Sequence, residues 1–348
     1  MSLPPAKTLL GAAVAAARLG ARELKAGFGS NLTVGTKSHG RDLVTQVDLA
    51  SERVVLAALA ERWPQIGLLA EETGMTRPGA EAMWIVDPLD GTTNFAHGYP
   101  VFCVSVACVD REGSLVGVIL DPLRDELFTA VRGEGAYLNG RRLTVSEVQT
   151  LDAALFTTGW PYFPPEWRRL AGQIFTEVMV VAGDARRSGS AALDLAYIAA
   201  GRSEAHFELN LSPHDIAAGL LLVGEAGGRY EALAQARNGG WPPGLVAFQR
   251  QRATRSACNA GRGTSRPPSP AVQLRVGVPG GVGLAVRVAR RSRTTIATPT
   301  IGFLYRTNPQ LVHARRMLPP RIASVSGAAQ PGQKRYSNSE VLLTTRRG

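Results

Sequence analysis

The stretch Trp84–Tyr99, WIVDPLDGTTNFAHGY, carries the features that decide the fold and the chemistry of this chain. An apolar run ends in Asp87, a turn containing proline follows, and Asp90 comes three residues later. Two carboxylates this close repel each other, and a divalent metal ion is the usual neutralising partner. The Gly-Thr-Thr that follows supplies N–H groups and hydroxyls where a helix could begin, as a phosphate group requires. The stretch therefore predicts metal-assisted chemistry on a phosphate ester.

Charge is distributed unevenly along the chain. Residues 1–230 contain 20 Lys and Arg against 26 Asp and Glu, whereas residues 231–348 contain 19 against 2. The formal net charge of +11 therefore comes entirely from the C-terminal third. Such asymmetry is typical of a nucleic-acid-binding tail, or of two parts that do not share one origin.

The remaining composition favours a cytoplasmic protein without a membrane partner. Cys103, Cys108 and Cys258 have neither metal-ligand spacing nor the pattern of a disulfide framework, which fits a reducing compartment. No apolar run approaches the roughly 20 residues of a membrane span. The Ala-rich segment Leu9–Ala17 resembles a short signal-peptide core, but charged residues continue its pattern directly. We therefore expect an amphipathic first helix there.

Helices and strands alternate along the chain as far as residue 248. The pattern predicts helices over residues 7–27 and 48–62, with Asp48 as the N-cap of the second. It predicts short strands over 66–70 and 83–86, which end at Glu71 and Asp87. The alternation lacks the even βα rhythm of a doubly wound sheet. A layered α/β or α+β domain is the expected fold class.

Five acidic residues each lie at the end of a predicted strand or helix. Such ends are where distant parts of a fold can converge on one site. Oxygen ligands without cysteine or paired histidine favour Mg²⁺ over Zn²⁺, and several carboxylates allow two ions about 3.5–4 Å apart. The five residues are Asp48, Glu71, Asp87, Asp90 and Asp215.

Four motifs, in order and spacing, resemble the signatures of the inositol monophosphatase family. They are DLVTQVD at 42–48, LLAEET at 68–73, WIVDPLDGTTNF at 84–95 and PHDIAAGLLLVGEAGG at 213–228. This family belongs to the lithium-sensitive, Mg²⁺-dependent sugar-phosphatase superfamily. The resemblance covers roughly residues 7–230. It implies alternating helix and sheet layers of the inositol monophosphatase and fructose-1,6-bisphosphatase type, and a catalytic domain over residues 1–248.

The resemblance also implies where metal ions and the attacking water bind. Two or three Mg²⁺ ions are implied, with the third and weakest near Glu71. Thr92, supported by Asp48, would orient water for direct in-line attack without a covalent enzyme intermediate. The first ion would be held by Glu71, Asp87 and the backbone carbonyl of Leu89, and the second by Asp87, Asp90 and Asp215.

A further set of residues matches the family's substrate-binding positions. Backbone N–H groups after Asp90 would hold the phosphate, a lysine on the loop before DLVTQVD would lie near it, and a carboxylate would accept hydrogen bonds from sugar hydroxyls. The implied set is Lys37, Gly91, Thr92, Thr93, Gly189, Ser190, Ala191 and Glu208.

The resemblance favours hydrolysis of inositol 1-phosphate or a similar small phosphorylated polyol by a homodimer. Related enzymes hydrolyse histidinol phosphate, 3′-phosphoadenosine 5′-phosphate or fructose 1,6-bisphosphate, so these substrates stay open. Some bacterial relatives act in RNA-polymerase complexes, which leaves a regulatory role as the alternative. Nucleic acid could bind only through the basic tail.

Structural interpretations of single residues also stay open. Asp48 and Asp215 could simply cap the helices that begin beside them, and we expect Glu72 to be a solvated neighbour of Glu71. Many family members have tryptophan before the last metal-binding aspartate, and this chain has His214. The chain also departs from the family after Phe248, where residues 249–348 are rich in Arg, Pro and Gly. We expect that tail to be disordered or to result from a shifted reading frame.

Overall fold

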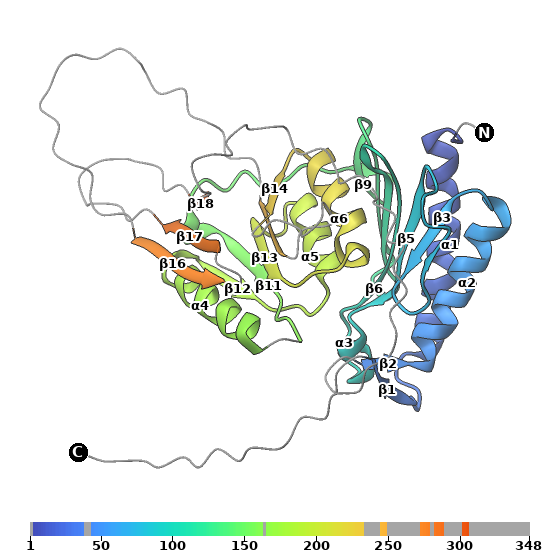
Figure 1. Ribbon diagram of the computed structural model, residues 1–348, viewed down its shortest axis with the longest axis horizontal. Helices are drawn as coiled ribbons and strands as arrows, with labels where there is room; N and C mark the ends of the chain where they lie inside the picture. The colour runs from blue at the N-terminus through green and yellow to red at the C-terminus, as the bar shows by residue number, and fades with distance from the viewer. Residues whose placement is uncertain are drawn as a thin grey trace, which may run out of the picture.

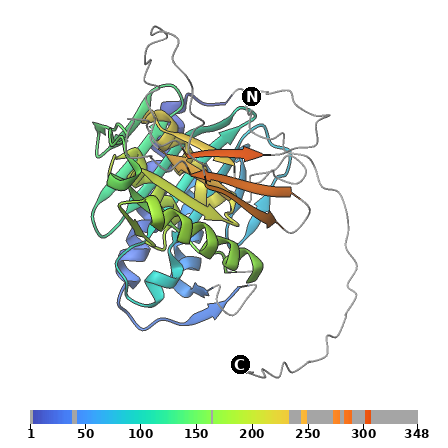
Figure 2. The same cartoon turned by 90° about the vertical axis from the view of Figure 1, so that its left-hand side faces the viewer.

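Helices and sheets stack in alternating layers (Figure 1). Two helices, α1 (Ala6–Gly27) and α2 (Gln46–Arg62), cover one face of an eight-stranded sheet. Helices α5 (Ala191–Ala199) and α6 (Pro213–Glu225) separate it from a five-stranded sheet, and α4 (Pro165–Val181) packs on that second sheet. Figure 2 looks along this stack from the α4 side. The computed structural model describes residues 3–37, 43–162, 165–232 and 244–248, with the backbone of three further strands at 272–278, 282–288 and 301–305.

The eight-stranded sheet has the order β10-β9-β8-β7-β6-β5-β3-β4. Strands β3 and β5 pair in parallel, and all other neighbouring strands of this sheet pair antiparallel. The carboxyl ends of β3 and β5 therefore lie at the same edge of the sheet. The strands are β3 (Gly67–Ala70), β4 (Gly74–Thr76), β5 (Met83–Asp90), β6 (Cys103–Asp110), β7 (Gly113–Asp121), β8 (Glu126–Val131), β9 (Gly135–Leu138) and β10 (Arg141–Arg142).

The five-stranded sheet has the order β12-β11-β13-β15-β14 and joins segments that are far apart in the sequence. The last of them in the chain, β15, pairs with both β13 and β14, so the strand-like sequence GLVAF completes this layer. The strands are β11 (Leu155–Thr158), β12 (Asp184–Arg186), β13 (Ala205–Leu209), β14 (Arg229–Ala232) and β15 (Gly244–Phe248). The short elements are β1 (Val34–Thr36), β2 (Leu43–Thr45), α3 (Thr92–Ala96) and the 3₁₀ turn η1 (Leu151–Ala153).

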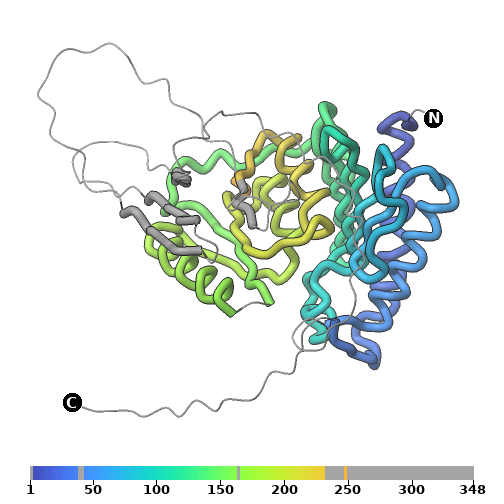
Figure 3. Tube along the Cα trace, in the orientation of Figure 1, coloured from blue at the N-terminus to red at the C-terminus, as the bar shows by residue number. Residues whose placement is uncertain are grey.

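The centre of the large sheet is buried on both faces because helices cover both (Figure 3). Along β6, Cys108 packs among the residues of α1 and α2, whereas Cys103 packs on the opposite side with residues of α5 and α6. Two cysteines five residues apart in a strand are expected on opposite faces, and the structure has them there.

The layered fold expected from the sequence is confirmed, and one helix boundary is corrected. The first helix begins within one residue of its predicted start. The second begins at Gln46 rather than at Asp48, because Thr45 is its N-cap. The Thr45 hydroxyl accepts from the N–H of Asp48, and the Asp48 carboxylate accepts from the N–H of Thr45 at 2.9 Å, which makes a capping box.

The C-terminal region contributes three strands that pair only with one another in the part of the chain that the structure describes. They are β16 (Val272–Val278), β17 (Val282–Val288) and β18 (Ile301–Tyr305), and they form an antiparallel sheet. The remaining tail residues, for which we expect disorder or a shifted frame, lie outside the described residues. Among the described helices, none has both the length and the apolar character that crossing a membrane needs.

The close approach of β7 to α6 gives a test of the packing. A Cβ added at Gly117 in β7 would lie 3.0 Å from the backbone Cα and carbonyl oxygen of Ala218 in α6. Backbone atoms cannot rotate aside, so Gly117→Ala should lower the free energy of unfolding by about 1–3 kcal/mol. Urea unfolding followed by circular dichroism measures this change.

Gly224→Ala, in the same helix α6, is the matched control. No atom lies within 4 Å of an added Cβ there. Alanine at that exposed helical position should be neutral or stabilising by about 0.5–1 kcal/mol. Equal stability of the two variants would contradict the tight contact between β7 and α6.

Candidate metal centre and substrate pocket

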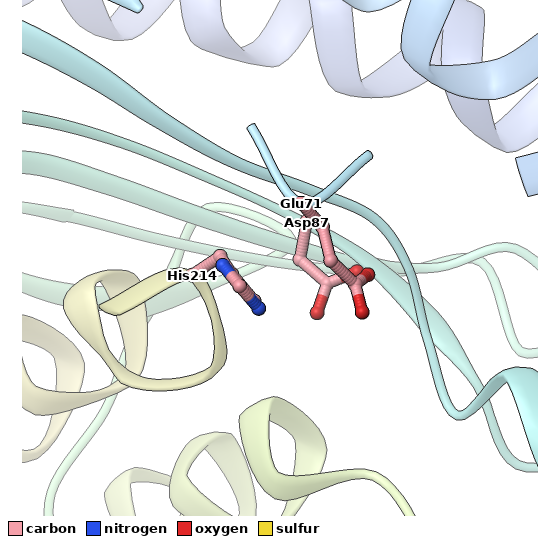
Figure 4. A group of neighbouring side chains, drawn as sticks. All are labelled: Glu71, Asp87 and His214. Atoms are coloured by element: carbon pink, nitrogen blue, oxygen red, sulfur yellow. The ribbon is translucent and has the colours of Figure 1, made fainter. Parts of the chain in front are cut away.

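The parallel pairing of β3 with β5 places Glu71 beside Asp87. Ala70 is the partner of Val86 in that pairing, and each acidic residue follows next in its strand direction. In Figure 4 the two carboxylates project from this edge into the space that the imidazole of His214 also enters, and His214 comes from the first turn of α6. The carboxylate oxygens of Glu71 and Asp87 and a ring nitrogen of His214 lie within 4.8 Å of one another.

A second group forms around the same aspartate. Asp87, Asp90 and Asp215 each have a carboxylate oxygen within 4.8 Å of the other two. Residues three apart in a regular strand point to opposite faces. In β5, however, the register against β6 shifts between Asp87 and Asp90, and this irregularity lets both carboxylates face the same point. The first turn of α6 brings Asp215 from the other side.

Burial and neighbouring carboxylates raise the pKa values of all three aspartates. Burial raises the pKa of Asp87 well above its usual range, and the charges of Glu71, Asp90 and Asp215 raise it further. Burial and the charge of Asp215 do the same to the pKa of Asp90. The pKa of Asp215 rises to about 6, again mainly through burial. This part of the pocket therefore favours any cation that can enter it.

Lys37 supplies positive charge at one end of the group. Its Nζ lies 2.5 Å from Oε1 of Glu71 and 2.6 Å from Oε1 of Glu72. Burial lowers the pKa of this lysine, but the two carboxylates outweigh it and raise the pKa above its ordinary value. The expectation that Glu72 is solvated is wrong, because its side chain is only 9% exposed in this ion pair.

Thr92 and Asp48 form the hydrogen-bonded pair that the resemblance implied. Thr92 Oγ1 lies 2.9 Å from Asp48 Oδ1 and 3.1 Å from the carbonyl oxygen of Leu89. The other oxygen of Asp48 accepts from Thr45, so the carboxylate is fixed in orientation. Burial raises the pKa of Asp48, while its hydrogen bonds from Thr45 and Thr92 lower it.

The turn after Asp90 has the geometry of an anion cradle. Gly91 is the N-cap of α3 with a φ of 103°, and a Cβ there would lie 2.9 Å from the carbonyl oxygen of Val101. Only glycine fits this position without strain. Thr92 and Thr93 are the first residues of the helix, and N–H groups in a first turn have no partner within the helix. The Thr93 hydroxyl lies 3.1 Å from that of Tyr162.

The segment 189–191 closes over Asp90. Ser190 donates its hydroxyl to Oδ2 of Asp90 at 2.6 Å, and the N–H of Ala192 donates to the same oxygen at 2.7 Å. Gly189 has a φ of 92°, and a Cβ there would lie 2.7 Å from Nδ2 of Asn94. The segment therefore orients a proposed metal ligand as well as lining the pocket.

Glu208 on β13 lines the pocket, and a buried histidine contacts its carboxylate. Its Oε2 lies 3.3 Å from Nε2 of His206, and Nδ1 of that buried ring lies 3.5 Å from a carboxylate oxygen of Asp194. A Cβ on Gly159 would overlap the Glu208 carboxylate. The carboxylate is therefore positioned by its neighbours on both sides.

Twelve of the fourteen residues predicted from the sequence line one cavity of about 400 Å³, and the other two are Asp48 and Thr93. Asp48 and Thr93 contact it through Thr92 and Tyr162, and residues 38–42 lie outside the described residues. Sequence reasoning did not assign a role to further lining residues, which are Leu43, Thr158, Gly159, Trp160, Pro161, Tyr162, Arg187, Asp194, Leu209, Asn210, Leu211, Ser212 and His214.

The donor set fits Mg²⁺. The Asp87–Asp90–Asp215 group offers carboxylates alone, two of them buried, and hard oxygen ligands of this kind suit Mg²⁺. The repulsion among these groups is relieved when a divalent ion binds between them. The backbone carbonyl of Leu89 lies in the same turn and also lines the cavity.

Comparison with known proteins identifies the class to which this fold and site belong. The model of the inositol monophosphatase family matches residues 6–260. The chain therefore belongs to that family, and the resemblance drawn from the four motifs is confirmed.

Several individual relatives are similar to the chain. It is 47% identical over 193 residues to the Nus factor SuhB of Pseudomonas aeruginosa, covering 54% of this chain and 71% of the relative. The crystal structure of the extragenic suppressor protein suhB from Bartonella henselae has a TM-score of 0.66 and 38% identity, over 70% of this chain and 95% of that one. The inositol monophosphatase from Anabaena has a TM-score of 0.62 and 36% identity, over 70% and 92%.

The raised pKa of Asp215 predicts how metal-free stability depends on pH. The folded pKa, about 6, is above the ordinary value of 3.8. The contribution of this group is therefore fully present below the ordinary value and is lost as the pH rises through about 6. In EDTA at pH 8, Asp215→Asn should unfold with a free energy about 1–3 kcal/mol higher than the wild type. Asparagine keeps an oxygen that can accept from the N–H of Ser212.

Urea unfolding at pH 4.5 and pH 8 measures this difference, which should shrink at the lower pH. Added Mg²⁺ should stabilise the wild type more than the variant. Asp184→Asn, at an exposed ion pair with Arg186, is the control and should not gain stability. A variant less stable than the wild type at both pH values would contradict the proposed repulsion.

Proposed function

We propose that this protein is a Mg²⁺-dependent phosphate monoester hydrolase that acts on inositol 1-phosphate or a similar small phosphorylated polyol. One observation carries the proposal. Asp87, Asp90 and Asp215 converge on one point beside the hydrogen-bonded pair Thr92–Asp48, at the bottom of a cavity of about 400 Å³. A cavity of this size accommodates a small phosphorylated sugar.

The carboxylates would hold the metal ions. Glu71, Asp87 and the carbonyl of Leu89 would hold one ion, and Asp87, Asp90 and Asp215 another. Bound Mg²⁺ would supply positive charge that polarises the phosphate and lowers the pKa of water. The chain's own contribution is to fix the carboxylates, which it does through the hydrogen bonds of Leu89 N–H to Asp87 and of Ser190 to Asp90.

Thr92 and Asp48 would orient the attacking water. With its proton donated to Asp48, the Thr92 hydroxyl presents lone pairs that can accept a hydrogen bond from water. Burial raises the pKa of Asp48, which makes its carboxylate a better proton acceptor. The N–H groups of Gly91, Thr92 and Thr93 would bind the phosphate oxygens at the start of α3.

Glu208 would select a substrate rich in hydroxyls. Its carboxylate faces the cavity opposite the acidic group and accepts hydrogen bonds only, so it suits a polyol ring. His206 holds it from behind at 3.3 Å. Similarity to structures named inositol monophosphatase supports an inositol phosphate over histidinol phosphate, 3′-phosphoadenosine 5′-phosphate or fructose 1,6-bisphosphate.

Loss of the Thr92 hydroxyl tests the catalytic proposal. Thr92→Val keeps the shape of the side chain but cannot orient water, so kcat should fall by roughly 10²- to 10³-fold. Phosphate release from a panel of substrates, with Mg²⁺ and with or without Li⁺, measures this. Thr176→Val, on the exposed face of α4, is the control and should keep full activity. Equal rates for the two variants, or no release from any substrate by the wild type, would contradict the proposal.

A regulatory role is the second candidate, because curated relatives bear the name Nus factor SuhB. That name fits the role in RNA-polymerase complexes that the sequence left open. The chain also carries 19 Lys and Arg against 2 Asp and Glu after residue 230, a balance that favours contact with nucleic acid phosphates.

A binding assay separates the two functions. If the basic region binds RNA, affinity should fall steeply with salt and should be lost in a chain ending at residue 250, because phosphate contacts release counterions. Filter binding of a labelled RNA at several salt concentrations measures this. Thr92→Val should bind as the wild type does. RNA binding that persists without the tail would assign it to another surface.

A further inference from the structure

His214 directs an imidazole into a site whose other ligands are carboxylates. It is the second residue of α6, and its ring lies in one group with Glu71 and Asp87. Figure 4 shows the tip of the ring pointing toward the two carboxylates. The side chain is 15% exposed and lines the cavity.

The start of α6 fixes the position of this ring. Pro213 occupies the first helical turn, and Asp215 accepts from the N–H of Ser212 at 2.6 Å, which sets the direction of the helix. The backbone carbonyl of His214 accepts from the Ser105 hydroxyl on β6 at 3.4 Å. Its Nε2 lies 3.9 Å from Oδ1 of Asp215. The backbone at His214 is therefore fixed on both sides, and its ring nitrogen lies near carboxylate oxygens.

Imidazole changes which metal ion such a group prefers. Oxygen-only groups suit Mg²⁺, whereas neutral imidazole nitrogen suits ions of the first transition row, whose affinity rises from Mn²⁺ to Cu²⁺ and falls again at Zn²⁺. The two acidic groups of this pocket share Asp87 but differ in this respect. The Asp87–Asp90–Asp215 group offers oxygen alone, and the Glu71–Asp87–His214 group offers oxygen and nitrogen.

We propose that Nε2 of His214 is a metal ligand, and that the Glu71–Asp87–His214 group binds a transition-metal ion such as Mn²⁺ in preference to Mg²⁺. The pocket would then hold two kinds of ion, with Asp87 between them. This proposal rests on the proposed function for the metal-binding role of Asp87, and it concerns the identity of one ion and one additional ligand.

The simpler role for His214 is that of a counter-charge to the carboxylates. A protonated imidazole would neutralise Glu71 and Asp87, as Lys37 does on the other side of Glu71. A divalent ion would then displace the ring instead of binding its nitrogen. The two roles predict opposite results when a metal is added, because only a ligand gives direct contact between the metal and nitrogen.

Pulsed electron paramagnetic resonance of the full chain with one equivalent of Mn²⁺ distinguishes them. The wild type should show the hyperfine coupling of a directly bound imidazole nitrogen, and His214→Gln should lose it. Calorimetric titration should show that the ratio of Mn²⁺ to Mg²⁺ affinity falls at least about tenfold in that variant. His97→Gln, which removes an exposed histidine outside the cavity, should change neither result.

Each outcome decides the proposal without an activity assay. A wild-type spectrum without nitrogen coupling overturns it even if His214→Gln fails to fold. Nitrogen coupling that persists in a folded His214→Gln variant also overturns it. Nitrogen coupling in a chain that releases no phosphate would support the ligand and contradict the proposed function. Phosphate release with no nitrogen coupling would support the proposed function and overturn His214 as a metal ligand.

Discussion

The mutual repulsion of buried carboxylates is the constraint on which the rest of this site depends. Asp87, Asp90 and Asp215 lie within 4.8 Å of one another, and each has its pKa raised by burial. A folded protein keeps such a group only when the surrounding structure fixes it, because its burial costs stability. The layers provide that support. The large sheet is covered on both faces, and α6 packs against β5, β6 and β7 close to the site.

The N-terminal turns of α2 and α6 orient two carboxylates, because one oxygen of each accepts a capping hydrogen bond and the other faces the site. One oxygen of Asp48 completes the capping box of α2, and the other binds Thr92. Asp215 likewise gives one oxygen to the N–H of Ser212 and leaves the other 3.9 Å from His214. Both residues therefore take part in helix capping, and in each the capping box directs the remaining oxygen toward the proposed site.

The sequence predicted the layered fold and the acidic residues that meet, because both depend on local patterns. The ends of apolar runs located Glu71 and Asp87, and the motif order located Asp215. The sequence could not show that Glu72 is buried against Lys37 or that Trp160 and Arg187 line the cavity. Those placements depend on which strands become neighbours, and no local pattern encodes the pairing of β11 with β13. The imidazole of His214 was noted as a departure, but its approach to Glu71 required the crossing of α6 over β5.

The charge of the cavity implies that, under the proposed function, an anionic substrate would need the metal ions in order to bind. The residues that line it include six carboxylates, against the two permanent cations Lys37 and Arg187. An anionic ester entering this field alone would be repelled, and N–H groups at the start of α3 cannot offset several full charges. Divalent ions would reverse the local potential and so create affinity for a phosphate ester. Under the proposed function, Glu208 on β13 of the five-stranded sheet would act on hydroxyls, so the polyol and the phosphate would be recognised by residues of different sheets. Substitutions on β13 would then change which polyol is accepted without moving the carboxylates on β5.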